Sequence, residues 1–179
     1  EERVKVIIDK DEKTITISDN GIGMSAEEVD KYINQIAFSG ATEFLDKYKD
    51  DDAKQAIIGH FGLGFYSSFM VSDRVDIITK SQKPKSKAVK WSCDGSPEYT
   101  IEETKKSAPG TDVVLHIADD SIEFLEETRI GGILNKYCKF MPVEIEFGTR
   151  KEMQDDPSDE KDDEGNAKQI SVNVPNIIN

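Results

Sequence analysis

Apolar and polar residues alternate over several short stretches of this 179-residue chain. A period of two predicts strands over residues 3–8 and 14–18, joined by a polar hairpin turn. Short apolar runs bounded by Pro, Gly and Asp predict four further strands. These lie over residues 75–78, 88–91, 99–101 and 111–117. Alternation near the end predicts a closing hairpin made of residues 143–147 and 170–174.

Apolar residues at helical spacing lie between these strands. An amphipathic helix is predicted over residues 26–36, with an apolar stripe made of Val29, Tyr32, Ile33 and Ile36. Ser25 and Glu28 form a Ser-x-x-Glu capping box at its start. A small, glycine-containing stretch follows, and then a short helix with Phe44, Leu45 and Tyr48 on one side. A helix, a glycine hinge and a second helix in this order predict a mobile lid.

Two more helices are predicted further along the chain. Residues 65–71 form an apolar run that predicts a buried helix, and residues 122–140 show helical spacing with Ser121 as the cap. Gly131 and Gly132 weaken the second of these helices by about 1 kcal/mol each relative to alanine. The pair indicates either a bend or a close approach to a neighbouring element.

Charge and composition exclude several classes of function. The net charge is −13, from 23 basic and 36 acidic residues, which disfavours a general nucleic-acid binder because that affinity depends on lysine and arginine. No apolar run approaches the roughly 20 residues of a membrane helix. We therefore expect a soluble, cytoplasmic protein with no nucleic-acid or membrane partner.

The sequence contains no pattern typical of a metal site or a disulfide. Cys93 and Cys138 lie far apart, and neither His60 nor His116 stands at metal-ligand spacing from them. We expect the cysteines to fill core space. Residues 150–168 hold eight acids against four bases but lack the spacing of a calcium loop, so they predict a solvated, disordered loop.

The turn that contains Asp19, Gly21, Gly23 and Met24 is the first candidate binding element. It connects the second predicted strand to the first helix, so Asp19 lies at a strand end. The two glycines let the backbone turn and let a flat ligand come close. A carboxylate accepts a hydrogen bond from an exocyclic amine, and Met24 offers an apolar wall to a ring. These features fit adenine, although the same pattern also describes ordinary connections.

A second glycine cluster, Gly59, Gly62 and Gly64, precedes the helix predicted over residues 65–71. Glycines at a helix entrance expose backbone N–H groups beside the positive end of the helix dipole, which favours phosphate. Two standard nucleotide motifs do not fit. The P-loop spacing lacks the lysine and hydroxyl that must follow, and the dinucleotide pattern at Gly21 lacks a strand–helix–strand context.

Both clusters together, followed by Gly110 and Thr111, resemble the superfamily of gyrase B, heat-shock protein 90, histidine kinases and MutL. Within it the chain is most similar to the amino-terminal domain of heat-shock protein 90, of a bacterial type, over roughly residues 4–148. The likeness implies an α+β fold, a two-layer sandwich with helices on one side of an antiparallel or mixed sheet. It also implies an ATP-binding domain over residues 1–148, an acidic hairpin tip over 149–168, and a last strand that leads over 169–179 towards a middle domain.

The resemblance assigns roles to individual residues. It implies that Asp19 binds the adenine amine with support from Thr111 and a water, and that Gly23 and Met24 line the base. The phosphates of ATP or ADP would meet the backbone N–H groups of Gly62, Leu63, Gly64 and Phe65. The lid would contain Tyr32, Phe38, Ser39 and Gly40. Family members usually carry Asn, Lys and Gln where this chain has Tyr32, Phe38 and His60, so this lid supplies no lysine to a phosphate.

The family's catalytic glutamate and the asparagine that holds Mg²⁺ lie on a helix before the first strand here. The chain starts without methionine inside a strand-like pattern, so we expect a fragment that contains no catalytic or metal-binding residue, binds nucleotide weakly and hydrolyses none. For the intact protein the resemblance implies a homodimeric, ATP-dependent chaperone that closes on unfolded or partly folded clients. The alternatives are a histidine-kinase-type catalytic domain and a nucleotide-binding module without hydrolysis.

Overall fold

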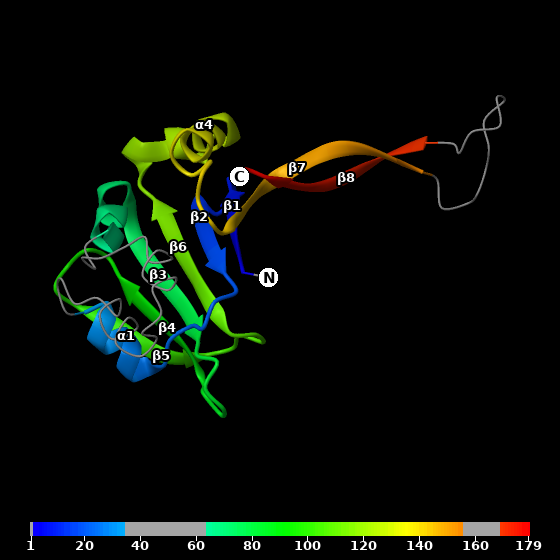
Figure 1. Cartoon of the computed structure of the whole chain (residues 1–179). Helices are drawn as coiled ribbons and strands as arrows, with labels where there is room; N and C mark the ends of the chain where they lie inside the picture. The colour runs from blue at the N-terminus through cyan, green and yellow to red at the C-terminus, as the bar shows by residue number, and fades with distance from the viewer. Residues whose placement is uncertain (1, 35–63, 156–168) are drawn as a thin grey trace, which may run out of the picture.

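The computed structural model of the chain describes residues 2–34, 64–155 and 169–179. The strands of these residues form one mixed sheet in the order β5-β4-β3-β6-β2-β1-β7-β8 (Figure 1). Only β1 and β7 run parallel, and every other described neighbour pair is antiparallel. The strands are β1 (Arg3–Asp9), β2 (Thr14–Asp19), β3 (Ser72–Lys80), β4 (Ala88–Cys93), β5 (Tyr99–Thr104), β6 (Gly110–Ile117), β7 (Glu144–Asp155) and β8 (Gln169–Ile177).

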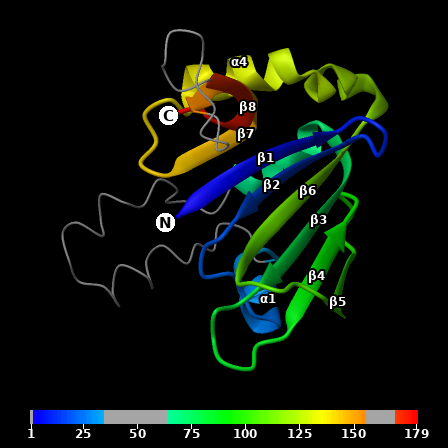
Figure 2. The same ribbon diagram turned by 90° about the vertical axis from the view of Figure 1, so that its right-hand side faces the viewer.

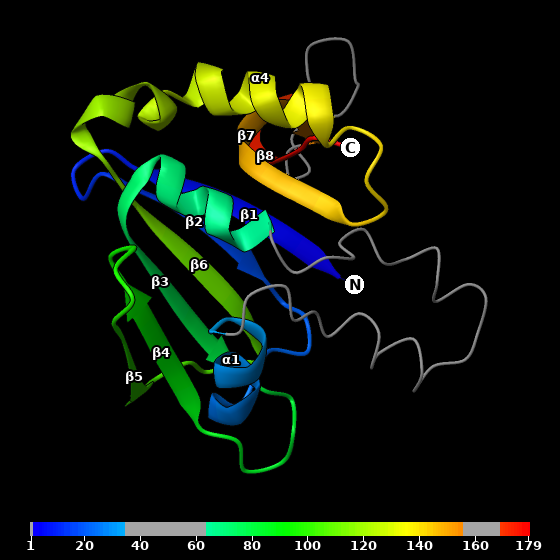
Figure 3. The same cartoon turned by 90° about the vertical axis from the view of Figure 1, so that its left-hand side faces the viewer.

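The described helices lie on one face of this sheet. They are α1 (Ala26–Tyr32), the 3₁₀ helices η1 (Gly64–Met70) and η2 (Asp119–Leu125), and α4 (Glu127–Tyr137). Figure 3 shows α1 and η1 in front of the strands, and Figure 2 shows the opposite face with the strands in front. The expected two-layer α+β sandwich with a mixed sheet is confirmed. Within the described part of the chain, no helix is long and apolar enough to cross a membrane.

The core consists of two apolar clusters between the layers. One joins α1 and η1 to β3 and β4 around Val29, which has no exposed surface, and Val75, Ile77 and Trp91. The other joins η2 and α4 to the strands around Val6, Ile15, Leu125 and Ile145. Val75 and Ile77 are two residues apart on β3, so the period of two that predicted strands also determines which face is buried.

Helix α1 ends earlier than the apolar spacing predicted. It stops at Tyr32 with Ile33 as its C-cap, whereas the sequence pattern predicted a helix to residue 36. The Tyr66 hydroxyl donates a hydrogen bond to the Ile33 carbonyl at 2.7 Å, and Trp91 Nε1 donates to Asn34 Oδ1 at 2.8 Å. These contacts with η1 and β4 hold the end of the helix. The Ser25–Glu28 capping box is present as predicted.

Two other helix predictions need correction. The predicted buried helix over 65–71 is the 3₁₀ helix η1, and none of its residues is fully buried. The predicted helix over 122–140 is divided at Glu126, where extended backbone separates η2 from α4. Ser121 does not cap α4, because it lies inside η2 and its hydroxyl donates to Asp120.

The last hairpin is longer than alternation alone predicted. Strand β7 continues to Asp155, so residues 150–155 form a strand where the acidic composition predicted a loop. The ribbon of β7 and β8 extends away from the rest of the domain (Figure 1). The structure supports neither alternative for the glycine pair: α4 runs through both glycines, an added Cβ at Gly131 would lie 3.5 Å from Phe147 Cε1, an ordinary van der Waals distance, and one at Gly132 would meet nothing within 4 Å.

Candidate nucleotide-binding site

Asp19 is the last residue of β2, and its side chain lies where three strand ends meet. Its Oδ1 accepts hydrogen bonds from the backbone N–H groups of Gly21, at 2.8 Å, and Thr111, at 3.2 Å. Both bonds reach the same oxygen. Among the described residues, no donor bonds to Oδ2, and the side chain is half-buried. The carboxylate is thus held in place with one oxygen left to accept a further hydrogen bond.

Two glycines allow the backbones around Asp19 to approach closely. Gly23 has a φ of +60°, and a Cβ there would lie 1.9 Å from the Lys80 carbonyl oxygen. Gly110 has a φ of +126°, and a Cβ there would lie 2.2 Å from the Asp19 carbonyl oxygen. Any other residue at either position would separate the strand ends. The glycines therefore bring Asp19, Met24 and Thr111 together.

Thr79 of β3 is a component of the site that sequence analysis missed. It has no exposed surface and pairs directly with Thr111 across β3 and β6. Its Oγ1 accepts the Met24 N–H at 2.9 Å, donates to the Gly110 carbonyl at 3.2 Å and lies 2.9 Å from Thr111 Oγ1. Every second residue of β3, from Val75 through Ile77 to Thr79, faces the core. A polar residue at such a position is the signal that could have identified Thr79.

The loop after Asp19 is also held from the turn that follows β3. The Ile22 carbonyl accepts the Gln82 N–H at 2.8 Å, and Lys83 Nζ lies 2.6 Å from Glu28 Oε1. Burial acts to raise the pKa of Glu28, but the hydrogen bonds from Lys83 and the Ser25 N–H outweigh it and hold that pKa below its ordinary value. The carboxylate of the capping box is therefore charged at neutral pH and fixes the start of α1.

The other predicted site residues divide into two groups. Phe65 and Met24 both pack against the cluster around Val29, and the Phe65 ring stands edge-on to Trp91 with ring centroids 5.6 Å apart, so the start of η1 lies over the same apolar layer as the Asp19 loop. Gly64 opens η1, and Tyr32 is the last residue of α1. Gly62, Leu63 and the lid residues Phe38, Ser39 and Gly40 lie outside the described residues, as does His60.

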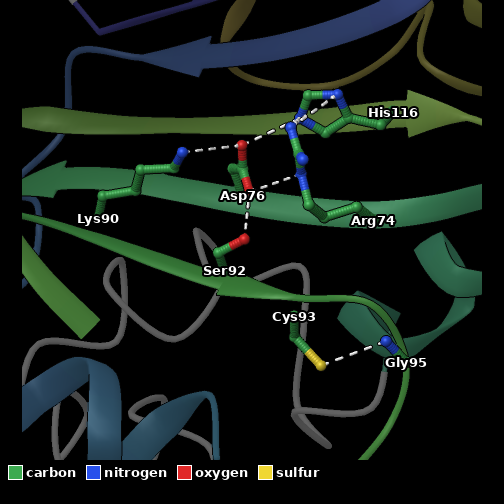
Figure 4. A network of polar contacts seen from close by, with 7 residues as sticks. All are labelled: Arg74, Asp76, Lys90, Ser92, Cys93, Gly95 and His116. Carbon is green, nitrogen blue, oxygen red and sulfur yellow. Dashed lines mark hydrogen bonds and ion pairs between the residues drawn. The ribbon is translucent and has the colours of Figure 1, made fainter. Parts of the chain in front are cut away.

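A second polar cluster lies on the open face of the sheet, away from the helices. Its centre is Asp76 of β3, whose side chain is 6% exposed, and Figure 4 shows the cluster. Oδ1 accepts the Ser92 hydroxyl at 2.6 Å and lies 3.3 Å from Arg74 Nε, while Oδ2 lies 2.9 Å from His116 Nε2 and 3.3 Å from Lys90 Nζ. Because neighbouring residues of a strand face opposite sides, Asp76 points away from the layer that contains Thr79.

The sequence matches a known protein family. A family described as "Histidine kinase-, DNA gyrase B-, and HSP90-like ATPase" matches residues 1–122. The chain belongs to this family of ATPases. The resemblance indicated by the two glycine clusters and Asp19 is thereby confirmed at the level of the family.

The proteins similar to this HSP90-like ATPase domain include bacterial chaperones. Chaperone protein HtpG of Bacteroides fragilis is 59% identical over 176 residues, which cover 98% of this chain and 24% of that protein. HtpG of Porphyromonas gingivalis is 59% identical over 162 residues, 90% of this chain and 23% of that protein. HtpG of Idiomarina loihiensis is 42% identical over 165 residues, which cover 91% of this chain and 25% of that protein. The chain thus spans about a quarter of the length of these relatives.

Proposed function

We propose that this domain binds ATP or ADP with the adenine ring between Asp19 and Met24. The observation that supports this most directly is the fixed carboxylate of Asp19, which has one oxygen bonded to two backbone N–H groups and the other without a described donor. Such an oxygen suits the exocyclic amine of adenine. Met24 is half-buried and packs against the apolar cluster around Val29, so its side chain offers an apolar wall to a ring.

The phosphates would lie towards the start of η1. Gly62, Leu63, Gly64 and Phe65 are the residues we assign to them through backbone N–H groups, which suit anions at a helix entrance. The half-buried Phe65 ring supports this placement, because it anchors the start of η1 on the cluster that also holds Met24. Tyr32, Phe38, Ser39 and Gly40 are proposed to form the lid. Mg²⁺ would accompany the nucleotide, and we assign no described residue to it.

For the full-length protein we propose an ATP-dependent molecular chaperone with ATPase activity. The support is the family match over residues 1–122 and the identity to proteins named as HtpG chaperones over nearly the whole chain. Binding and hydrolysis of ATP would close the lid and a homodimeric clamp on unfolded client proteins in the cytoplasm. The residues of this domain would contribute by holding the adenine and positioning the phosphates.

Suppression of aggregation tests this function in the full-length protein. A client such as citrate synthase is heated with the wild-type protein, with and without ATP, and light scattering is recorded. We expect ATP to change the protection given by the wild type, and Asp19→Asn to abolish this effect of ATP while leaving the protein folded by circular dichroism. Protection by the wild type that is the same with and without ATP would contradict the chaperone mechanism. Phosphate transfer to a histidine of a partner protein would favour a kinase.

A further inference from the structure

We propose that Thr79 is a positioning residue that determines which purine the site accepts, by fixing the direction of the Thr111 hydroxyl. Thr79 is completely buried, and it pairs with Thr111, whose backbone N–H is donated to Asp19. It therefore acts through Thr111 and not by contact with the nucleotide. This inference rests on the proposed function, because it concerns the base-binding end of the same site.

The direction of the Thr111 hydroxyl follows from the number of protons and lone pairs on Thr79 Oγ1. The hydroxyl has one proton and two lone pairs. One lone pair accepts the Met24 N–H at 2.9 Å, and the proton is donated to the Gly110 carbonyl at 3.2 Å. The remaining contact, 2.9 Å to Thr111 Oγ1, is then a hydrogen bond only if Thr111 is the donor. With this assignment all three contacts of Thr79 are satisfied at once, as a buried polar group requires.

The consequence concerns the lone pairs of Thr111. Its hydroxyl proton points to Thr79, so the oxygen can only accept further hydrogen bonds. The Thr111 N–H is already donated to Asp19 Oδ1. Asp19 and Thr111 together thus present only acceptors to a ligand. A purine with an amine at position 6 supplies two N–H donors to this set, whereas a 6-oxo purine places an acceptor at position 6, retains only the N1–H as a donor on this edge, and is disfavoured.

The test compares ADP with inosine diphosphate, which has an oxygen in place of the amine, by isothermal titration of the full-length protein. We expect the wild type to prefer ADP. Thr79→Ser keeps the hydroxyl and retains this preference. Thr79→Val has nearly the same volume but cannot accept the proton of Thr111, which becomes free to turn towards a 6-oxo group. We expect the preference for ADP to fall by about fivefold, the size of one neutral hydrogen bond.

Thr111→Val provides a second route if Thr79→Val does not fold. This substitution removes the acceptor oxygen of Thr111 without changing the fully buried Thr79. We expect it also to lower the preference for ADP. An unchanged preference in Thr79→Val or Thr111→Val overturns the inference, and so does an equal loss in Thr79→Ser. A wild type that binds ADP and inosine diphosphate equally overturns it while ATP binding stands. A wild type that binds neither nucleotide overturns the proposed function, and this inference with it.

Discussion

Single residues control the geometry around Asp19, and glycine is the clearest example. Gly23 combines a positive φ with a backbone oxygen 1.9 Å from the place of its missing Cβ, whereas Gly132 in α4 has nothing within 4 Å of that place. The sequence indicated a turn at Gly23 but could not show the contact with Lys80, which comes from a strand more than fifty residues later. Thr79 was missed for the same reason, because its partners are brought together only by the pairing of β3 with β6.

Alanine substitutions at these two glycines should therefore have opposite effects on stability. Gly23→Ala is expected to lower the free energy of unfolding by about 3 kcal/mol, through the strained φ and the clash with Lys80. Gly132→Ala is expected to raise it by about 0.5–1 kcal/mol, because alanine favours the helix and fits the open space. Urea denaturation followed by circular dichroism measures both. A Gly23→Ala protein as stable as the wild type would show that the strand ends are less close than described.

At the level of elements, local patterns identified the strands well and the ends of helices poorly. Alternation located β1, β2, β7 and β8, since burial of one face imposes a period of two, and apolar runs bounded by turn residues located the other four strands of the described chain. Helix boundaries depended on contacts between distant residues, such as Tyr66 with Ile33 at the end of α1. The polar cluster around Asp76 was also not predicted, because its side chains come from β3, β4 and β6 and meet only in the folded sheet.

This cluster makes stability depend on pH in a defined direction. Burial acts to raise the pKa of Asp76, but hydrogen bonds from Ser92, His116 and Lys90 outweigh it, so the pKa in the folded protein lies below the ordinary 3.8. As the pH falls, the unfolded chain takes up this proton first, so the stabilisation is complete above about pH 5 and is lost as the pH falls through the folded pKa.

Asp76→Asn tests this dependence directly. At pH 7 we expect the variant to lose about 2 kcal/mol of unfolding free energy, because the four donors around position 76 lose a charged acceptor. Below pH 3.5 the difference between variant and wild type should shrink. Asp73→Asn, an exposed position on the same strand, is the matched control and should change stability by less than about 0.5 kcal/mol. A deficit for Asp76→Asn that stays constant from pH 7 to pH 3 would exclude the proposed linkage.

For the whole molecule, motif order predicted the family, whereas the structure identified which residues support the site. Asp19, Gly23, Met24 and Thr111 lie together as the motifs suggested, although Thr111 reaches Asp19 through its backbone N–H and not through its hydroxyl. Spacing in sequence could not distinguish these two contacts, since both place the same residue beside the same carboxylate. The two-layer fold then presents these groups at one end of the sheet, next to the apolar layer under α1 and η1.

Calorimetric titration of ADP into the full-length protein and its Asp19→Asn variant examines the role of Asp19 most directly, with Asp73→Asn as a control that makes the same chemical change elsewhere. We predict that wild type and Asp73→Asn bind ADP with the same affinity. Asp19→Asn should weaken binding at least about 30-fold, because a charged acceptor for the adenine amine is lost at a half-buried position. Equal ADP affinity in the wild type and in a folded Asp19→Asn variant would show that this carboxylate does not bind the base.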